Sequence, residues 1–299
     1  MFLPQLLNQR IAARVIRTAD ITLSGLPISV VVTTKDAAGT INECLSAIFS
    51  NSPGEVIIVD GKSNDETIEI ARKYPVVVLS DKGKGLSHAR QLGAEAATQT
   101  FLSFVNPDVV LGSGSLSRML VELERGNCTV IHARLNSFGK QTGYWELCQQ
   151  RQHDMGEEKR KGDYLGILAC LMRRETAINF GLDSPDRMHA QLDDISLEIK
   201  LKRAGLRLCT SNATAYHYWE STARAVSRHR MHDGKMAALI LFRFGVFRVE
   251  AWPFIASFYW ILHSLATRQA RMIPYFVLCG LMQTVGFLRG LLTINNRDL

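Results

Sequence analysis

The chain of 299 residues lacks the signatures of several common protein classes. No two of its six cysteines have a C-x-x-C spacing, so the sequence suggests neither a zinc site nor a disulfide framework and predicts reduced, mostly buried thiols. No G-x-G-x-x-G follows the first predicted strand, and no G-x-x-x-x-G-K-[ST] occurs. A dinucleotide-binding fingerprint and a P-loop are therefore absent. The sequence also has neither internal repeats nor low-complexity segments.

Charge is unevenly distributed along the chain, whose formal net charge is +7. Residues 1–25 have a net charge of +2, residues 26–222 of −2 and residues 223–299 of +7. The central part lacks the basic character of a nucleic-acid-binding domain, so we expect no nucleic-acid partner. Hydrophobic residues make up 46% of the chain and charged residues 21%, so it can bury a core and is not a disordered protein.

The basic C-terminal part is also apolar. Residues 251–267 and 272–288 are uncharged runs of 17 residues, at the lower limit for crossing a bilayer. With flanking arginines and several aromatic residues they predict contact with a membrane surface. The alternatives are a helical hairpin packed on the main domain and an oligomer interface. A hairpin that spans the membrane would carry Arg268 and Arg271 to the far side, against the positive-inside tendency, so helices in the interface or a shallow re-entrant hairpin are preferred.

The N-terminal segment, residues 1–25, predicts a basic amphipathic helix. Leu3, Leu7 and Ile11 recur at helical spacing, while the arginines face elsewhere. The segment lacks the long apolar core and small-residue cleavage site of a signal peptide. An ordinary surface helix is the alternative interpretation.

The central region, residues 26–222, alternates predicted strands with predicted helices. Apolar, β-branched runs predict strands at residues 27–34, 55–60, 76–81 and 100–105. This alternation indicates a parallel sheet with helices on both faces. Polar clusters end three of these strands, and ligands of such sheets bind beyond the carboxyl ends of the strands. The three clusters are Thr33-Thr34, Asp60 and Asn106-Pro107-Asp108.

The order of these motifs resembles glycosyltransferase family 2. VVVTTKDAA corresponds to the strand and P-T-Y-N-E that open the family pattern, VDGKSNDET to V-D-D-G-S-x-D-x-T, and NPD to D-x-D. KGKGLSHARQLG, RRETAINFGLD, LDDISLEIKLKRAG and TAYHYWES follow in the expected order, and together these motifs cover about residues 27–235. The resemblance implies a GT-A fold, a mainly parallel nucleotide-sugar-binding sheet with helices on both faces, here followed by C-terminal apolar helices. The Q-x-x-R-W of processive members is absent, so polymer synthesis is not expected.

A nucleotide-sugar donor must release a diphosphate, and a divalent cation, Mn²⁺ or Mg²⁺, held by carboxylates can neutralise its charge. Asp108 is the first-choice ligand. Asn106 can offer only a carbonyl oxygen. The alternative for Asn106-Pro107-Asp108 is a turn after a strand. His217 ends a predicted strand at the family position of a metal ligand or a phosphate contact, although a lone histidine is more often structural.

The resemblance also implies a set of residues that bind the nucleotide sugar. Asp60 would accept a hydrogen bond from the base, unless it closes an Asx-turn in DGKS. Arg90 and the weaker candidate Lys84 would reach the diphosphate, unless they are solvated surface groups. Asp65 is assigned a structural role at the start of a helix. The predicted donor-binding residues are Thr33, Thr34, Asp36, Asp60, Lys84, Arg90 and Asn106.

Asp193 and Asp194 fall near the start of a predicted helix, a position that capping and the helix dipole partly explain. By resemblance, Asp194 is the catalytic base that deprotonates the acceptor hydroxyl for attack with inversion at the anomeric carbon. Asp193 would orient Asp194 or the acceptor.

The sequence therefore predicts a membrane-associated, inverting glycosyltransferase with a cytoplasmic catalytic domain at 26–222 and a membrane-associated helical region at 223–299. It would move a single sugar to a lipid-linked glycan or polyprenyl phosphate, and oligomers are possible. The rivals are a nucleotidyltransferase and a scaffold built on a decayed domain. The sequence departs from the family pattern at four positions, Lys35, Ala37, Gly61 and Asn106.

Overall fold

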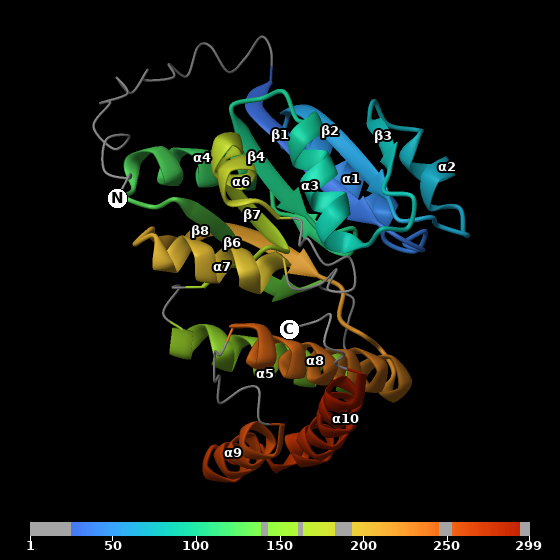
Figure 1. The fold of residues 1–299 in the computed structure, drawn as a ribbon, viewed down its shortest axis with the longest axis vertical. Coiled ribbons are helices and arrows are strands. Elements are labelled where there is room, and N and C mark those ends of the chain that lie inside the picture. Colours follow the sequence, from blue (N-terminus) through green and yellow to red (C-terminus); the bar gives the residue numbers. More distant parts are fainter. Residues whose placement is uncertain (1–24, 139–142, 161–163, 183–192, 245–252, 294–299) are drawn as a thin grey trace.

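The computed structural model describes residues 25–138, 143–160, 164–182, 193–244 and 253–293. The predicted N-terminal amphipathic helix lies outside these residues. Among them, eight strands form one mixed sheet of order β3-β2-β1-β4-β7-β6-β8-β5 (Figure 1). The strands are β1 (Leu26–Thr34), β2 (Pro53–Asp60), β3 (Val77–Ser80), β4 (Phe101–Val105), β5 (Val109–Leu111), β6 (Val130–Ser137), β7 (Ala169–Arg173) and β8 (Leu208–His217).

The first four strands in spatial order, β3, β2, β1 and β4, are parallel, as the alternating strand and helix pattern predicts. β7 then runs antiparallel to both β4 and β6, while β6 and β8 are parallel to each other. Because β7 is antiparallel to both of its neighbours, β6 and β8 run in the same direction as β1. β5 completes the sheet as an antiparallel partner of β8.

Helices cover both faces of this sheet, because the central strands carry apolar side chains on both of their faces. Val30 and Val32 of β1 pack under α1 (Ile41–Ser50), α2 (Thr67–Ala71) and α4 (Ser115–Arg125). Val31 faces the opposite layer, which contains α3 (Leu86–Ala96), α6 (Arg174–Phe180) and α7 (Asp193–Arg203). α3 approaches β1 so closely that a Cβ on Gly93 would overlap the Val31 side chain.

The remaining helices gather in a separate cluster at one side of the sheet (Figure 1). They are α5 (Tyr144–Arg160), α8 (Ala223–Phe244), α9 (Pro253–Ala266), the short 3₁₀ helix η3 (Ala270–Met272) and α10 (Ile273–Thr293). Their shared core includes Met155, Val226, Tyr275 and Phe276. α5 thus packs with the C-terminal helices although its residues fall inside the range predicted for the catalytic domain.

The contact between α8 and α10 is backbone to backbone. A Cβ on Gly234 would overlap the main chain of Gln283, and one on Gly286 would overlap that of Met231. Glycines at both positions let the two helices touch, as small residues do at close helix crossings. Arg230 of α8 is fixed at the same contact, because it donates to the Tyr275 hydroxyl at 2.9 Å.

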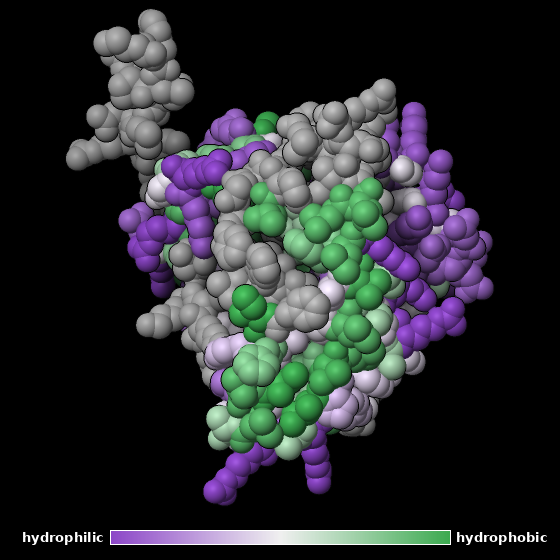
Figure 2. Space-filling model, turned by 60° about the horizontal axis from the view of Figure 1, so that its bottom comes forward, coloured by the Kyte–Doolittle hydropathy of each residue, from purple (hydrophilic) through white to green (hydrophobic). Residues whose placement is uncertain are grey.

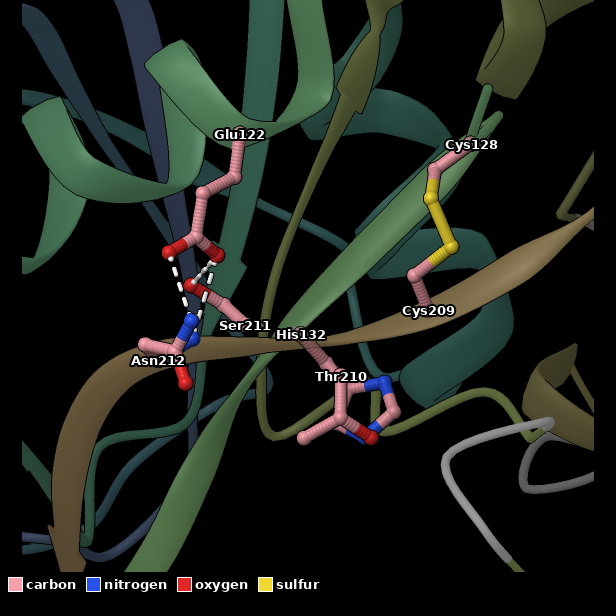
Figure 3. The surroundings of a disulfide bond; sticks show 7 residues. All are labelled: Glu122, Cys128, His132, Cys209, Thr210, Ser211 and Asn212. Carbon is pink, nitrogen blue, oxygen red and sulfur yellow. Dashed lines mark hydrogen bonds between the residues drawn. A yellow bond between two sulfur atoms is a disulfide. The ribbon is translucent and has the colours of Figure 1, made fainter. Parts of the chain in front are cut away.

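Cysteine chemistry differs from the sequence-based expectation. Cys128 and Cys209 form a disulfide, with Cα atoms 6.0 Å apart (Figure 3). They lie 81 positions apart, and parallel pairing of β6 with β8 brings them together, since Ile131 stands opposite Cys209. The prediction of reduced thiols is wrong for this pair. It is confirmed for the other four cysteines, which are free and buried: Cys44, Cys148, Cys170 and Cys279.

Candidate active site

The carboxyl ends of β1, β2, β4, β6 and β8 lie at one edge of the sheet, which we call the active edge. Thr34 and Asp60 are direct neighbours there, at the paired ends of β1 and β2. Val105 ends β4, and His217 ends β8. The disulfide joins the opposite ends of β6 and β8. The active edge therefore collects the three polar clusters that the sequence places after strands.

Asp108 and His217 meet at this edge although they lie 109 positions apart in the sequence. The Asn106-Pro107-Asp108 segment turns the chain from β4 into β5, whose antiparallel pairing places Val109 opposite His217. The backbone N–H of Tyr218 donates to the Asp108 carbonyl at 2.9 Å, which locks this register. His217 Nε2 then lies 3.4 Å from Asp108 Oδ2.

Two polar atoms of this pair are buried without a hydrogen-bond partner among the described residues, Asp108 Oδ1 and His217 Nδ1. An unsatisfied buried carboxylate oxygen is costly, but Oδ1 is not the oxygen that faces His217, so the case for a bound ion depends on Oδ2 and Nε2. Two ligand atoms about 2.1 Å from one ion at an octahedral angle lie about 3 Å apart, close to the observed separation of Nε2 and Oδ2. The pair fits a divalent cation. Within the described ranges no cluster of three His, Cys, Asp or Glu side chains occurs, so the described side chains alone do not complete the shell of a cation.

The Asn106 side chain contacts helix α3. Its side-chain oxygen accepts a hydrogen bond from Arg90 Nη2 at 3.1 Å. Arg90 is only 3% exposed, which rules out the interpretation of Arg90 as a solvated surface group. The motif therefore offers one carboxylate, Asp108, while the amide of Asn106 holds an arginine of α3 at the active edge.

The loops that follow β1 and β2 are bound to each other. Asp60 Oδ1 accepts hydrogen bonds from the Ser63 hydroxyl at 2.7 Å and the Ser63 N–H at 3.1 Å, so the Asx-turn is formed. Asp36, in the left-handed region at φ 50°, accepts from the Asn64 N–H at 2.7 Å. Asp65 accepts from the Ala38 N–H at 3.0 Å, and its hydrogen bond with Thr67 lowers the pKa of its carboxyl.

Thr33 and Thr34 are buried at the end of β1, and Thr34 Oγ1 has no hydrogen-bond partner among the described residues. Lys84 is exposed in the loop before α3. Asp81 shapes this loop, because its buried carboxylate accepts from the Gly83 N–H at 2.6 Å and the Gly85 N–H at 2.9 Å. Asp81 was not among the predicted site residues, although its position before the glycines of DKGKG was an available signal.

Asp193 is the first residue of α7 and Asp194 the second, so the predicted acidic pair does stand at a helix start. Their side chains lie outside the described part of the structure. Their proposed roles therefore rest on the family resemblance.

A second group of residues, which the sequence analysis did not single out, supports His217. The Trp219 ring stands edge-on to His217, with ring centroids 4.3 Å apart. Trp219 Nε1 donates to Gln150 Oε1 of α5 at 2.8 Å, and the neighbouring Gln149 donates to the Glu220 carbonyl at 2.9 Å. The signal available in the sequence was the YWES segment directly after His217.

Glu220 and His229 form a close pair, with Oε1 and Nδ1 2.6 Å apart. Burial alone would raise the pKa of Glu220, but the hydrogen bond and charge of His229 outweigh it and hold this pKa at about 2. The hydrogen bond to Glu220 in turn raises the pKa of His229 above its usual value. This pair fixes the start of α8 against the chain that leaves β8.

Comparison with known proteins gives a consistent result. A family model described as "Glycosyl transferase family 2" matches residues 29–179. Glycosyltransferase AglE of Haloferax volcanii is 31% identical over 122 residues, which cover 35% of this chain and 40% of that protein. A PGL/p-HBAD biosynthesis glycosyltransferase of Mycobacterium tuberculosis is 31% identical over 88 residues, which cover 27% and 34%. The alignments thus span less than half of these relatives.

Solved structures show the same fold at low sequence identity. Mannosyltransferase PcManGT from Pyrobaculum calidifontis, in complex with GDP-Man and Mn²⁺, superposes with a TM-score of 0.61 at 16% identity, covering 90% of each chain. Glucosyl-3-phosphoglycerate synthase from Mycobacterium tuberculosis, in complex with Mg²⁺ and UDP, gives a TM-score of 0.52 at 17% identity, covering 74% of this chain and 80% of that one.

Proposed function

The chain belongs to glycosyltransferase family 2 and has the GT-A fold, and from this premise we propose that it transfers a single sugar, with inversion, from a nucleotide-sugar donor to a lipid-linked acceptor. The observation that carries the proposal is the meeting of Asp108 and His217 at the active edge, where Asp108 Oδ2 and His217 Nε2 lie 3.4 Å apart. A stray turn after β4 would not explain that arrangement.

Asp108 and His217 would hold a divalent cation, Mn²⁺ or Mg²⁺, as the ions bound by similar solved structures suggest. Such a cation neutralises the charge that develops on the departing diphosphate. With only one carboxylate, Asp108, this site would bind the cation weakly by itself and more strongly once donor phosphate oxygens complete its shell. Cation and donor should therefore bind cooperatively.

Arg90 and Asn106 would act together on the donor. The hydrogen bond from Arg90 to Asn106 fixes the guanidinium at the active edge, where a buried cation favours a diphosphate. Asp60 would recognise the base with the carboxylate oxygen that Ser63 leaves less engaged. Thr33, Thr34, Asp36 and Lys84 line the same edge and complete the proposed donor site.

Asp194 would be the base. It takes the proton from the acceptor hydroxyl, the hydroxyl oxygen forms a bond to the anomeric carbon, and the bond from that carbon to the diphosphate breaks. Asp193 would orient it. A polyprenyl phosphate acceptor is already anionic and needs no such base. Asp194→Asn should therefore abolish transfer to a hydroxyl acceptor and preserve transfer to a phosphate acceptor, and loss of both would contradict this division.

The acceptor class and location follow from the C-terminal region. Residues 223–299 carry a net charge of +7, and one helix of the described residues, Ala270–Leu292, is long and apolar enough to cross a membrane. We propose a catalytic unit at 26–222 on the cytoplasmic side of a membrane, with the helices of 223–299 in contact with it. A lipid-linked acceptor would then be presented at the surface to which the enzyme is bound.

The decisive test is calorimetric titration of UDP, GDP and dTDP into the purified chain, with and without Mn²⁺. At least one nucleotide should bind more tightly with Mn²⁺, and Asp108→Ala should remove this dependence. Glu124→Ala replaces an exposed acid on α4, away from the active edge, and should leave it unchanged. If a folded sample binds no nucleotide under any condition, the proposed donor site is wrong.

A further inference from the structure

The outer surfaces of α9 and α10 expose large apolar side chains. Of the fourteen large hydrophobic residues that are exposed in the described part of the chain, nine belong to these two helices. We call these nine the apolar face. They are Ile255, Phe258, Tyr259, Leu262 and Leu265 on α9, and Val277, Leu281, Leu288 and Leu292 on α10.

Each helix contributes one continuous stripe. On α9, residues 255, 258, 262 and 265 recur at helical spacing, and so do 277, 281, 288 and 292 on α10. The opposite sides of the helices are buried in the helical cluster, where Trp260 stacks on Phe276 with ring centroids 5.8 Å apart. Apolar residues form a band across this side of the molecule in Figure 2. The apolar face is therefore a single exposed surface, and its residues are not part of the hydrophobic core of the helical cluster.

The charge around the apolar face matches an anionic lipid surface. α9 contains no Asp, Glu, Lys or Arg, and Arg289 is the one such residue in α10. The link between the two helices carries Arg268 and Arg271, both exposed. No acidic residue occurs in α9, α10 or the described link between them, and an apolar surface with basic residues at its border is typical of helices that bind bilayers containing anionic lipid.

The packing of α10 decides between crossing a membrane and lying on it. α10 is long enough to cross, but its inner side touches α8 backbone to backbone at Gly234 and Gly286. A crossing α10 would therefore carry α8 into the hydrocarbon. α8 holds Arg230 and Asp233 at this contact and exposes Arg224, Arg228 and Lys235, and ionised groups are strongly disfavoured there.

We propose that the apolar face binds one leaflet of an anionic bilayer, with α9 and α10 lying along the interface and the link at 268–271 on the same side as the catalytic unit. The inference specifies the membrane contact proposed above. It does not rest on the transfer reaction, so it can be tested without donor or acceptor.

The first experiment is flotation of the full chain with vesicles of phosphatidylcholine alone or mixed with phosphatidylglycerol. Binding should require phosphatidylglycerol, and the double variant Phe258→Asp with Leu281→Asp should bind at least about tenfold more weakly. Both side chains are more than half exposed, so the fold should persist, as circular dichroism would verify. Val121→Asp, at an exposed site on α4, is the matched control and should bind like the wild type.

The second experiment locates the link. Arg268→Cys provides a thiol there, while the four free native cysteines are buried. In membrane vesicles with the cytoplasmic face outward, an impermeant maleimide should label this variant without detergent. Labelling only after detergent would mean that the helices span the membrane. The proposal would also be overturned if the Phe258→Asp, Leu281→Asp double variant bound vesicles as well as the wild type. A second contrary result would be a wild type that binds no vesicles but forms a lipid-free dimer, which the double variant dissociates. A failure to observe sugar transfer would not affect the proposed membrane contact, because neither experiment depends on the transfer reaction.

Discussion

In the purified, oxidised chain, removal of the Cys128–Cys209 disulfide should reduce stability by an amount that depends on the length of the loop that it closes. Such bonds are rare in the reducing cytoplasm proposed for the catalytic unit, so the effect is expected of the oxidised protein. The bond joins residues 81 positions apart, and the loop-closure relation gives about 4.5 kcal/mol at 25 °C for that length. This is a large part of the 5–15 kcal/mol that is typical of folded domains. Glu122 accepts from the Ser211 hydroxyl at 2.7 Å without involving either cysteine, so we expect this nearby contact to survive reduction (Figure 3).

The assay is urea unfolding of the wild type and of the Cys128→Ala, Cys209→Ala double variant, each with and without reductant. Reductant should lower the unfolding midpoint of the wild type to near that of the double variant, which should not respond. Donor binding at low temperature should persist, since the disulfide lies at the sheet edge opposite the active edge. Thiol titration of the unfolded wild type should find four reactive thiols. Six thiols, or an unchanged midpoint, would refute the reasoning.

Three further predictions concern the sheet, the site and the helical cluster. Gly93→Val should destabilise the fold by about 1–3 kcal/mol, as overpacked cores do, because its side chain would overlap Val31; a urea midpoint like that of the wild type would contradict this. Asp108→Asn should weaken Mn²⁺-dependent nucleotide binding more than nucleotide binding without Mn²⁺, as calorimetry would show; equal losses would argue against a ligand role. Glu220→Gln should destabilise the chain most between about pH 4.5 and pH 6.5. The lowered pKa of Glu220 makes the pair stabilise the folded state fully only above about pH 4.5, and the raised pKa of His229 makes it do so fully only below about pH 6.5. Thermal unfolding against pH measures this difference, and a profile that does not decline on either side of that window would contradict it.

The first half of the sheet could be predicted from sequence because each strand there is a short β-branched run that ends in polar residues. β1 and β2 show this pattern clearly, and their pairing brings Thr34 beside Asp60. The antiparallel insertion of β7 between β4 and β6 could not be predicted, because it depends on pairing between distant segments. The position of α5 among the C-terminal helices has the same origin.

The candidate site could be predicted in part. Asp108 and His217 were both selected, and they do meet, although the sequence alone could not show their contact. The engagement of Asn106 by Arg90 was not predicted, since it depends on how closely α3 packs on the sheet. The disulfide was missed for a related reason: spacing rules detect local cysteine pairs, whereas this pair is created by strand register.

Helix α5 connects the helices of the apolar face to the neighbourhood of His217. Near its start, the Tyr144 hydroxyl donates to the Arg271 carbonyl at 2.9 Å, beside α10. Six residues later, Gln150 accepts from Trp219, which stands against His217. Six helical residues span only about 9 Å along the helix axis, so this part of α5 is a short and rigid connection. If the apolar face rests on a bilayer, the reaction centre has a fixed height above the headgroups, so the enzyme would select acceptors by the distance between the lipid and the reacting group.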